Sequence, residues 1–125
     1  MTVLIDTSVL IDYLRGHGDA AQLLERERAA GPLHASEITR LEVLAGMRVD
    51  AEPQTRSLLS IFRWHAVDAE ITDKAGELGR AWLPSHPGLD AADLAIAATS
   101  VLLNARLLTM NVRHFPMFSE LTRPY

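Results

Sequence analysis

The sequence predicts an α/β fold, with a central parallel sheet of about four to five strands covered by helices on both faces. Two observations lead to this fold class. Short β-rich runs alternate with longer amphipathic segments along the chain, and the segment 91–103 is apolar nearly all round, as expected of a helix buried against a sheet. The 125 residues, 48% of them hydrophobic, suffice for one self-sufficient domain.

The first half of the chain is expected to hold two strands and three helices. The strands are 2–5 and 33–35, and the helices are 8–15, 20–30 and a third that begins after Ser36 and ends at Leu44 or Ala45. Gly16 ends the first helix, and Gly31 with Pro32 breaks the second. Ser36 is a suitable N-cap for the third helix, and Gly46 follows its last turn.

The second half of the chain is expected to continue the alternation. The helices are 55–62, 69–83 and 91–103, and the strands are 65–67 and 106–109. Pro84 stops the long helix, and Pro87 with Gly88 marks a loop before the next one. The residues from Asn111 onward contain further prolines and are assigned to no element.

The composition excludes several classes of protein. The chain has no cysteine, so it contains neither disulfides nor thiolate metal sites. The apolar run at its start is stopped at once by Asp6, which is unlike a signal peptide, and no segment approaches the roughly 20 apolar residues of a membrane span. We therefore expect a cytoplasmic protein that does not associate with membranes.

Oxygen-bearing side chains follow several of the predicted strands. Asp6 ends the first strand, Glu42 lies on the helix after the second, and Asp93 lies in the first turn of the buried helix. Thr109 and Asn111 stand at the end of the last strand. In open α/β sheets the working site lies beyond the carboxyl ends of the strands. Clustered carboxylates repel each other unless a hard cation such as Mg²⁺ joins them, so the sequence predicts a metal site there.

Two of these acids also have purely structural interpretations. Asp6 could simply cap the helix that follows it, and Ser8 could do the same. Glu42 lies at the margin of an apolar stripe, where it could extend its carboxylate to solvent or be an ion-pair partner of Arg40 or Arg48. Each residue taken alone leaves both interpretations open.

The third acid has a strong structural alternative as well. Asp90 as N-cap and Asp93 three residues later resemble a capping box, and a negative charge is favoured at a helix N-terminus. The helix that Asp93 opens is otherwise buried, however, and a carboxylate beside a buried surface needs a cation or hydrogen-bond donors. Asp12 lies in a short amphipathic helix and is expected to be solvated.

The charge balance leaves nucleic-acid binding open. The formal net charge of −4 argues weakly against it, but without the three proposed ligands the chain has 13 acids against 12 bases. Lys74 is the only lysine among those bases. Arginine suits phosphate, although it equally suits carboxylate partners, and a compositional bias of the genome explains the preference as well.

Several other enzyme classes lack their motifs in this sequence. The five histidines contain no i,i+4 pair, which argues against a zinc enzyme, and there is no Walker loop, GxGxxG or GxSxG motif. A phosphatase of the haloacid-dehalogenase type also begins with a strand and an aspartate. It needs a second aspartate two residues later, where Ser8 stands in this chain.

Four segments together resemble a known family. They are LIDTSVLIDYL at 4–14, SEITRLEVLAG at 36–46, DAADLAIAAT at 90–99 and LLTMNVRHF at 107–115. In the same order, they resemble the four motifs of VapC-like PIN-domain toxins and span nearly the whole chain. The resemblance implies a single PIN domain over 1–125, with an α/β/α sandwich around a parallel sheet.

The resemblance also implies a function and partners. It implies an endoribonuclease dependent on Mg²⁺ or Mn²⁺ that cleaves tRNA, rRNA or mRNA and acts as the toxin of a type II toxin–antitoxin pair. A VapB-like antitoxin would inhibit it and would carry any binding to promoter DNA. Similar toxins commonly form homodimers. Trp64 and Trp82 could belong to a partner surface, although aromatic residues at such positions are more often core.

By motif position, Asp6, Glu42 and Asp93 match the three acidic metal ligands of the family. Thr7 and Ser8 match the small polar residues that follow the first acid. The cation would activate water and stabilise the scissile phosphate, and Glu42 could assist deprotonation of that water.

The last motif departs from the family pattern. Thr109 matches its threonine, but many relatives carry a fourth acid where Asn111 or His114 stands here, and this puts a tightly held second metal in doubt. Asn111 and Thr109 are expected to orient water or phosphate, while His114 could contact a phosphate but fits a plain surface histidine better.

Two further expectations concern binding. Arg15, Arg40 and Arg113 lie close to the motifs in sequence and are expected at the rim of the site, where they would hold the RNA backbone. The rival hypothesis is a PIN fold whose weakened site only docks a partner protein or RNA.

Overall fold

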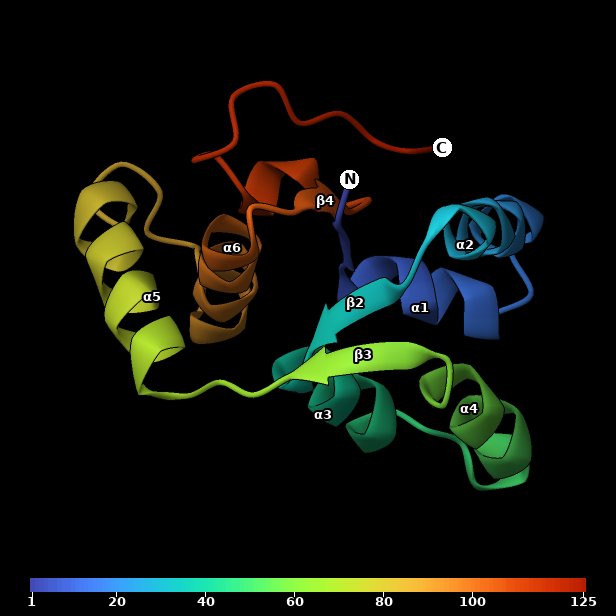
Figure 1. Ribbon diagram of the computed structural model, residues 1–125. Helices are drawn as coiled ribbons and strands as arrows, with labels where there is room; N and C mark the ends of the chain where they lie inside the picture. Colours follow the sequence, from blue (N-terminus) through green and yellow to red (C-terminus); the bar gives the residue numbers. More distant parts are fainter.

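A four-stranded sheet, parallel throughout, lies between two layers of helices (Figure 1). The computed structural model describes residues 1–125. In spatial order, the strands are β3 (Phe62–His65), β2 (Leu33–Ser36), β1 (Val3–Ile5) and β4 (Arg106–Leu108). This architecture confirms the predicted fold class and gives four strands.

Six α-helices and two short 3₁₀ helices connect and cover the strands. They are α1 (Thr7–Leu14), α2 (Gly18–Ala30), α3 (Glu37–Ala45), η1 (Val49–Ala51), α4 (Glu52–Leu59), α5 (Ala69–Trp82), α6 (Ala91–Leu103) and η2 (Val112–His114). None of these helices combines the length and the apolar character that crossing a bilayer requires.

The sheet is covered on both faces because successive side chains of its strands point into two different hydrophobic cores. Val3 and Ile5 belong to a core of 14 buried residues that is completed by α1, α2, α3 and α4. Leu4 points to the opposite face and packs in a second core with Ile96 of α6 and with Phe115. Strands buried on both faces are typical of parallel sheets between helical layers.

The positions of the predicted helix 55–62 and strand 65–67 were wrong. The helix begins earlier, at Glu52, and ends at Leu59, while the strand is 62–65. Phe62 pairs with Leu33 of β2 in the parallel register, and its side chain joins the larger core. Alternation of apolar and polar side chains over four residues fits helical spacing as well as strand spacing. The position of the strand is therefore set by its pairing with β2. The other elements agree with the prediction within two residues.

Three helix N-termini lie at the edge of the sheet where the parallel strands end. Asp6 is the N-cap of α1 directly after β1, Ser36 is the N-cap of α3 directly after β2, and Asp90 is the N-cap of α6. The last strand ends beside the first, since Ile5 pairs with Leu108. This edge therefore carries the residues that the sequence singled out.

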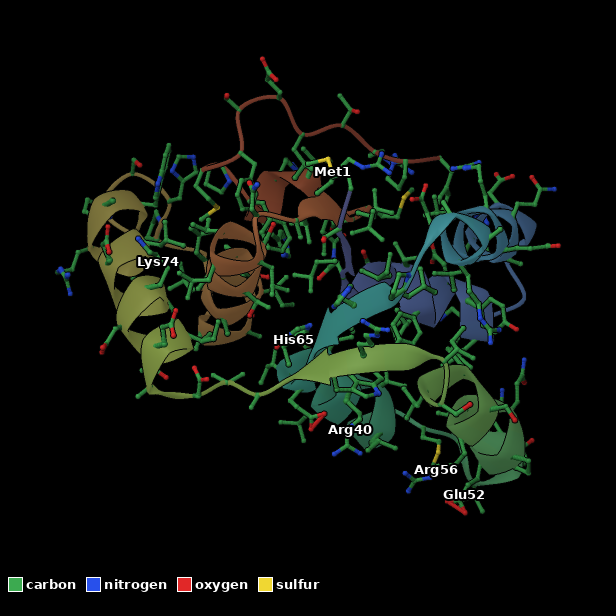
Figure 2. The ribbon with its side chains drawn as sticks, in the orientation of Figure 1. Met1, Arg40, Glu52, Arg56, His65 and Lys74 are labelled. Atoms are coloured by element: carbon green, nitrogen blue, oxygen red, sulfur yellow. The ribbon has the colours of Figure 1, made fainter.

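Two histidines form a pair on β2 and β3. From this pair we expect the stability of the protein to depend on pH. Nδ1 of His34 lies 2.8 Å from Nε2 of His65, which stands at the end of β3 (Figure 2). Burial lowers the pKa of His34, and nearby His65 and Arg63 lower it further. Below the ordinary histidine pKa of about 6.5, the unfolded chain takes up a proton that the folded chain binds less readily. Stability should therefore fall as the pH falls through this range.

We expect the His34→Gln protein to lose part of this dependence. Its melting temperature should drop by a few degrees less than that of the wild type between about pH 7.5 and pH 5.5. Thermal unfolding followed by circular dichroism at the two pH values measures the difference. His86→Gln, a change in the loop after α5, is the control and should behave as the wild type. An unchanged pH dependence in His34→Gln would show that the pair does not cause it.

Candidate active site

The carboxyl edge of the sheet contains a polar pocket of about 360 Å³, here called the acidic pocket. It is lined by Asp6, Thr7, Ser8, Ile11, Asp12, Arg15, Glu42, Asp90, Asp93, Ile96, Met110, Asn111 and His114. The three predicted metal ligands and Asn111 are therefore brought together from distant parts of the chain. Five of the lining residues are acids, so the pocket attracts cations and repels phosphate unless a cation is bound.

The Asp6 side chain is 4% exposed and serves two purposes. Its Oδ2 accepts hydrogen bonds from the Ser8 backbone N–H at 3.4 Å, the Ser8 hydroxyl at 2.7 Å and the Thr109 hydroxyl at 2.7 Å. Its Oδ1 accepts none. No fully buried side-chain oxygen of the chain lacks a partner, so Oδ1 must reach the pocket. Asp6 thus caps α1 with one oxygen and leaves the other available to a ligand.

Thr109 positions Asp6 and does not line the pocket. Its side chain is fully buried, its hydroxyl donates to Asp6, and its oxygen accepts the Asn111 backbone N–H at 2.9 Å. The expectation that Thr109 orients water or phosphate is therefore corrected, because the hydroxyl has no access to either. Ser8 completes the arrangement, since its oxygen also accepts the Met110 backbone N–H at 3.0 Å.

Glu42 is exposed and is held by a threonine from another helix. Its Oε1 lies 2.7 Å from the Thr7 hydroxyl oxygen, which lies 2.9 Å from the hydroxyl oxygen of buried Thr39. Its Oε2 accepts no hydrogen bond. Thr39 was missed by the sequence reasoning, although it lies on the same face of α3 three residues before Glu42.

The ion-pair alternative for Glu42 is excluded by the partners of the two arginines. Arg40 forms a bidentate pair with Glu37, with its Nε 2.8 Å from Oε1, and Arg48 lies 3.5 Å from Asp50. Figure 2 shows Arg40 on the side of α3 that faces away from the sheet. The prediction of Arg40 at the rim was therefore wrong.

Asp93 is held by a capping box and still lines the pocket. The Asp90 carboxylate accepts the Asp93 backbone N–H at 2.8 Å, and Asp93 Oδ2 accepts the Asp90 N–H at 3.3 Å. The other oxygen, Oδ1, lies 3.3 Å from Nδ1 of His114. Partial burial raises the pKa of Asp93, and the nearby Asp90 carboxylate adds to this effect, while the hydrogen bond from the Asp90 backbone N–H and the nearby His114 oppose it. A carboxylate in such surroundings gains from a cation.

The donor chemistry of the acidic pocket fits Mg²⁺ or Mn²⁺. As the side chains stand, no three acids or histidines lie close enough together to bind one ion. Mg²⁺ commonly binds through one or two carboxylates and keeps several waters, so this spacing is compatible with it. Asp6 Oδ1 and Glu42 Oε2 are the carboxylate oxygens without hydrogen bonds among the three predicted ligands.

Three other charged residues bear on the sequence expectations. Asp12 is half-buried and not fully solvated as expected, since it lines the pocket and accepts a hydrogen bond from the Tyr125 hydroxyl at 2.7 Å. Its position four residues after Ser8 on the same face of α1 was the signal for this placement. Arg15 lines the pocket as expected, and Arg113 is exposed on η2 and forms no ion pair.

The fold and the acidic pocket define an α/β/α protein with an oxygen-rich site at the carboxyl edge of a parallel sheet. The sequence model of the PIN domain family matches residues 3–120, and the chain belongs to this family. It is 43% identical over 123 residues to Ribonuclease VapC19 of Mycobacterium tuberculosis, covering 98% of both chains. It is 37% identical over 123 residues to Ribonuclease VapC10 of the same organism, covering 98% of this chain and 92% of the relative.

A solved structure confirms the fold independently. A toxin–antitoxin complex from Klebsiella pneumoniae contains a chain with which this protein superposes at a TM-score of 0.82 and 31% identity, covering 99% of this chain and 98% of the other. The family resemblance seen in the four sequence motifs is therefore confirmed.

Proposed function

We propose that this protein is an endoribonuclease dependent on Mg²⁺ or Mn²⁺ and the toxin of a VapBC-type pair, which cleaves tRNA, rRNA or mRNA and thereby stops translation. The observation that carries the proposal is the acidic pocket, which Asp6, Glu42 and Asp93 all line and in which Asp6 keeps one oxygen free. Relatives that cover nearly the whole chain and are named ribonucleases support the reaction type.

The roles of the residues follow from their positions in the pocket. Asp6, Glu42 and Asp93 would hold the cation, directly or through its waters. A bound Mg²⁺ or Mn²⁺ supplies an activated water and Lewis-acid stabilisation of the scissile phosphate. Asn111 is exposed in the pocket and can orient a water or phosphate through its side-chain amide. Arg15 can bind a phosphate of the RNA backbone.

The antitoxin would bind elsewhere on the molecule. An apolar groove of about 850 Å³ between α1, α2 and α4 includes Tyr13, Leu24, Leu58 and Ile61 and shares no residue with the acidic pocket. We assign it to an apolar segment of a VapB-like antitoxin, because six of the ten residues that line it are hydrophobic. The toxin–antitoxin complex in which a similar chain was solved supports a partner of this kind. DNA would be bound only through that partner.

A homodimer is the remaining part of the proposal. Val67 and Leu83 are exposed beside an apolar groove between α5 and α6, which could be buried against a second copy. Trp64 is not available for such a contact, since it packs against Phe62 and donates its indole N–H to the Leu59 carbonyl.

Cleavage of total bacterial RNA tests the proposal. The purified protein, free of antitoxin, is incubated with the RNA in Mg²⁺, in Mn²⁺ and in EDTA, and the new 5′ ends are sequenced. We expect discrete cuts with either metal and none in EDTA. If the folded protein makes no cut with either metal, the binding-module hypothesis replaces the nuclease.

A further inference from the structure

The segment after β4 brings an aromatic side chain back to α1, beside the acidic pocket. Figure 1 shows this segment crossing from the α6 side of the sheet toward α2. Its residue Tyr125 is half-buried and donates its hydroxyl proton to Asp12 Oδ2 at 2.7 Å. The Tyr125 ring also meets exposed His17, with 5.3 Å between ring centroids and 45° between the ring planes.

Unpaired arginines accompany the two rings. Arg15 lines the acidic pocket and forms no ion pair, although Asp12 lies one helical turn before it. The Asp12 carboxylate is instead engaged by Tyr125. Arg123 lies close enough to affect the ionisation of Tyr125, and it also forms no ion pair. Arg15, which stands two residues before His17 in the chain, thus remains free to bind a phosphate.

The position of the aromatic pair relative to Asp6 suits a neighbouring nucleotide. Asp6 caps α1, and Asp12 follows six residues later on that helix, about 9 Å along its axis. Asp12 lines the pocket, so the Tyr125 ring lies just outside it and not at the proposed metal. Rings beside guanidinium groups are the usual means by which proteins bind single-stranded RNA, because bases stack on the rings while phosphates meet the cations.

We propose that Tyr125, His17 and Arg15 form a subsite for an unpaired nucleobase next to the scissile phosphate. The inference rests on the proposed ribonuclease function and adds to it the residues that hold the nucleotide beside the cut. A base of any kind can stack on the outer face of the Tyr125–His17 pair, and Arg15 binds the phosphate that joins this nucleotide to the cut. The hydrogen bond to Asp12 holds the tyrosine ring in place.

Abasic scanning of a cleaved RNA tests the subsite. A short single-stranded RNA that spans a mapped cut site is synthesised with one base removed at each position in turn, and kcat/KM is measured for each RNA. For the wild type, we expect one position next to the cut to lose about tenfold when its base is absent, as when one base–aromatic stack is removed. For Tyr125→Leu and for His17→Ala, the same abasic RNA should be cut almost as fast as the intact one.

The controls separate stacking from a structural role of Tyr125. Tyr125→Phe keeps the ring and should keep the abasic penalty. His86→Ala removes a histidine that is tilted against Trp82 in a similar pair and does not line the pocket, so it should also keep the penalty. A general loss of folding would lower cleavage of every RNA alike, and it would not erase the difference between intact and abasic RNA.

The outcomes distinguish the inference from the function on which it rests. If the wild type shows no position-specific penalty, or if Tyr125→Leu keeps it in full, the subsite is wrong while the nuclease stands. If the wild type cleaves no RNA with either metal, the proposed function is wrong and the subsite falls with it.

Discussion

The Asp6→Asn protein should fold like the wild type and cleave RNA about a hundred- to a thousandfold more slowly. The fold is preserved because the asparagine oxygen can accept the bonds that Ser8 and Thr109 now donate to Oδ2, and asparagine is a good N-cap. The activity is lost because the amide nitrogen replaces Oδ1, the oxygen that reaches the pocket. An amide carries no charge and its nitrogen does not bind a cation.

Cleavage kinetics and calorimetric measurement of Mn²⁺ binding together test this prediction. Asp68→Asn is the matched control, because Asp68 is also an N-cap, accepts the Ile71 backbone N–H at 2.9 Å and lies on α5 outside the acidic pocket. It should cut RNA at the wild-type rate, whereas the loss of cleavage in Asp6→Asn purified in the same way excludes a contaminating nuclease. Asp6→Asn activity within tenfold of the wild type would remove Asp6 from the ligand set.

The parts of the fold that the sequence predicted are those specified by local patterns. β1 and the start of α1 follow from an apolar run stopped by Asp6, and α6 follows from a capping signal ahead of an apolar segment. β3 was displaced because its four residues carry too short a pattern to separate a strand from a helix end. Its place is decided by pairing with β2, a contact that no local pattern encodes.

The residues of the candidate site also fall into those that local patterns predicted and those that depend on long-range contacts. Asp6, Glu42 and Asp93 were found because each stands at a place where parallel folds gather their polar groups. The part played by Asp12 depends on Tyr125, which is 113 residues away in the sequence, and that of Thr109 depends on Asp6, 103 residues away. Contacts over such separations exist only once the chain has folded, so a single sequence offers no direct signal for them.

Thr109→Val should impair both stability and cleavage, although Thr109 does not line the pocket. Valine has nearly the shape of threonine, so the packing remains, but Asp6 Oδ2 loses a donor and the Asn111 backbone N–H loses its acceptor. Because Thr109 is fully buried, water cannot replace either bond at that position. We expect a loss of about 1–3 kcal/mol in the free energy of unfolding. Cleavage should fall by about tenfold or more, since a 1.4 kcal/mol loss of carboxylate positioning has that effect.

Urea unfolding measures the loss of stability, and kcat/KM for one mapped RNA measures the loss of cleavage. Two further variants serve as controls. Thr99→Val is the matched control, because Thr99 is equally buried but its hydroxyl donates only to the Ala95 carbonyl within α6. That carbonyl keeps its helical partner, so both stability and cleavage should stay close to the wild type. Thr109→Ser keeps the hydroxyl and should restore most of the cleavage despite the missing methyl group. If Thr109→Val instead loses stability but cuts RNA at the wild-type rate, Thr109 supports the fold alone, and Asp6 is positioned well enough by Ser8 and the start of α1.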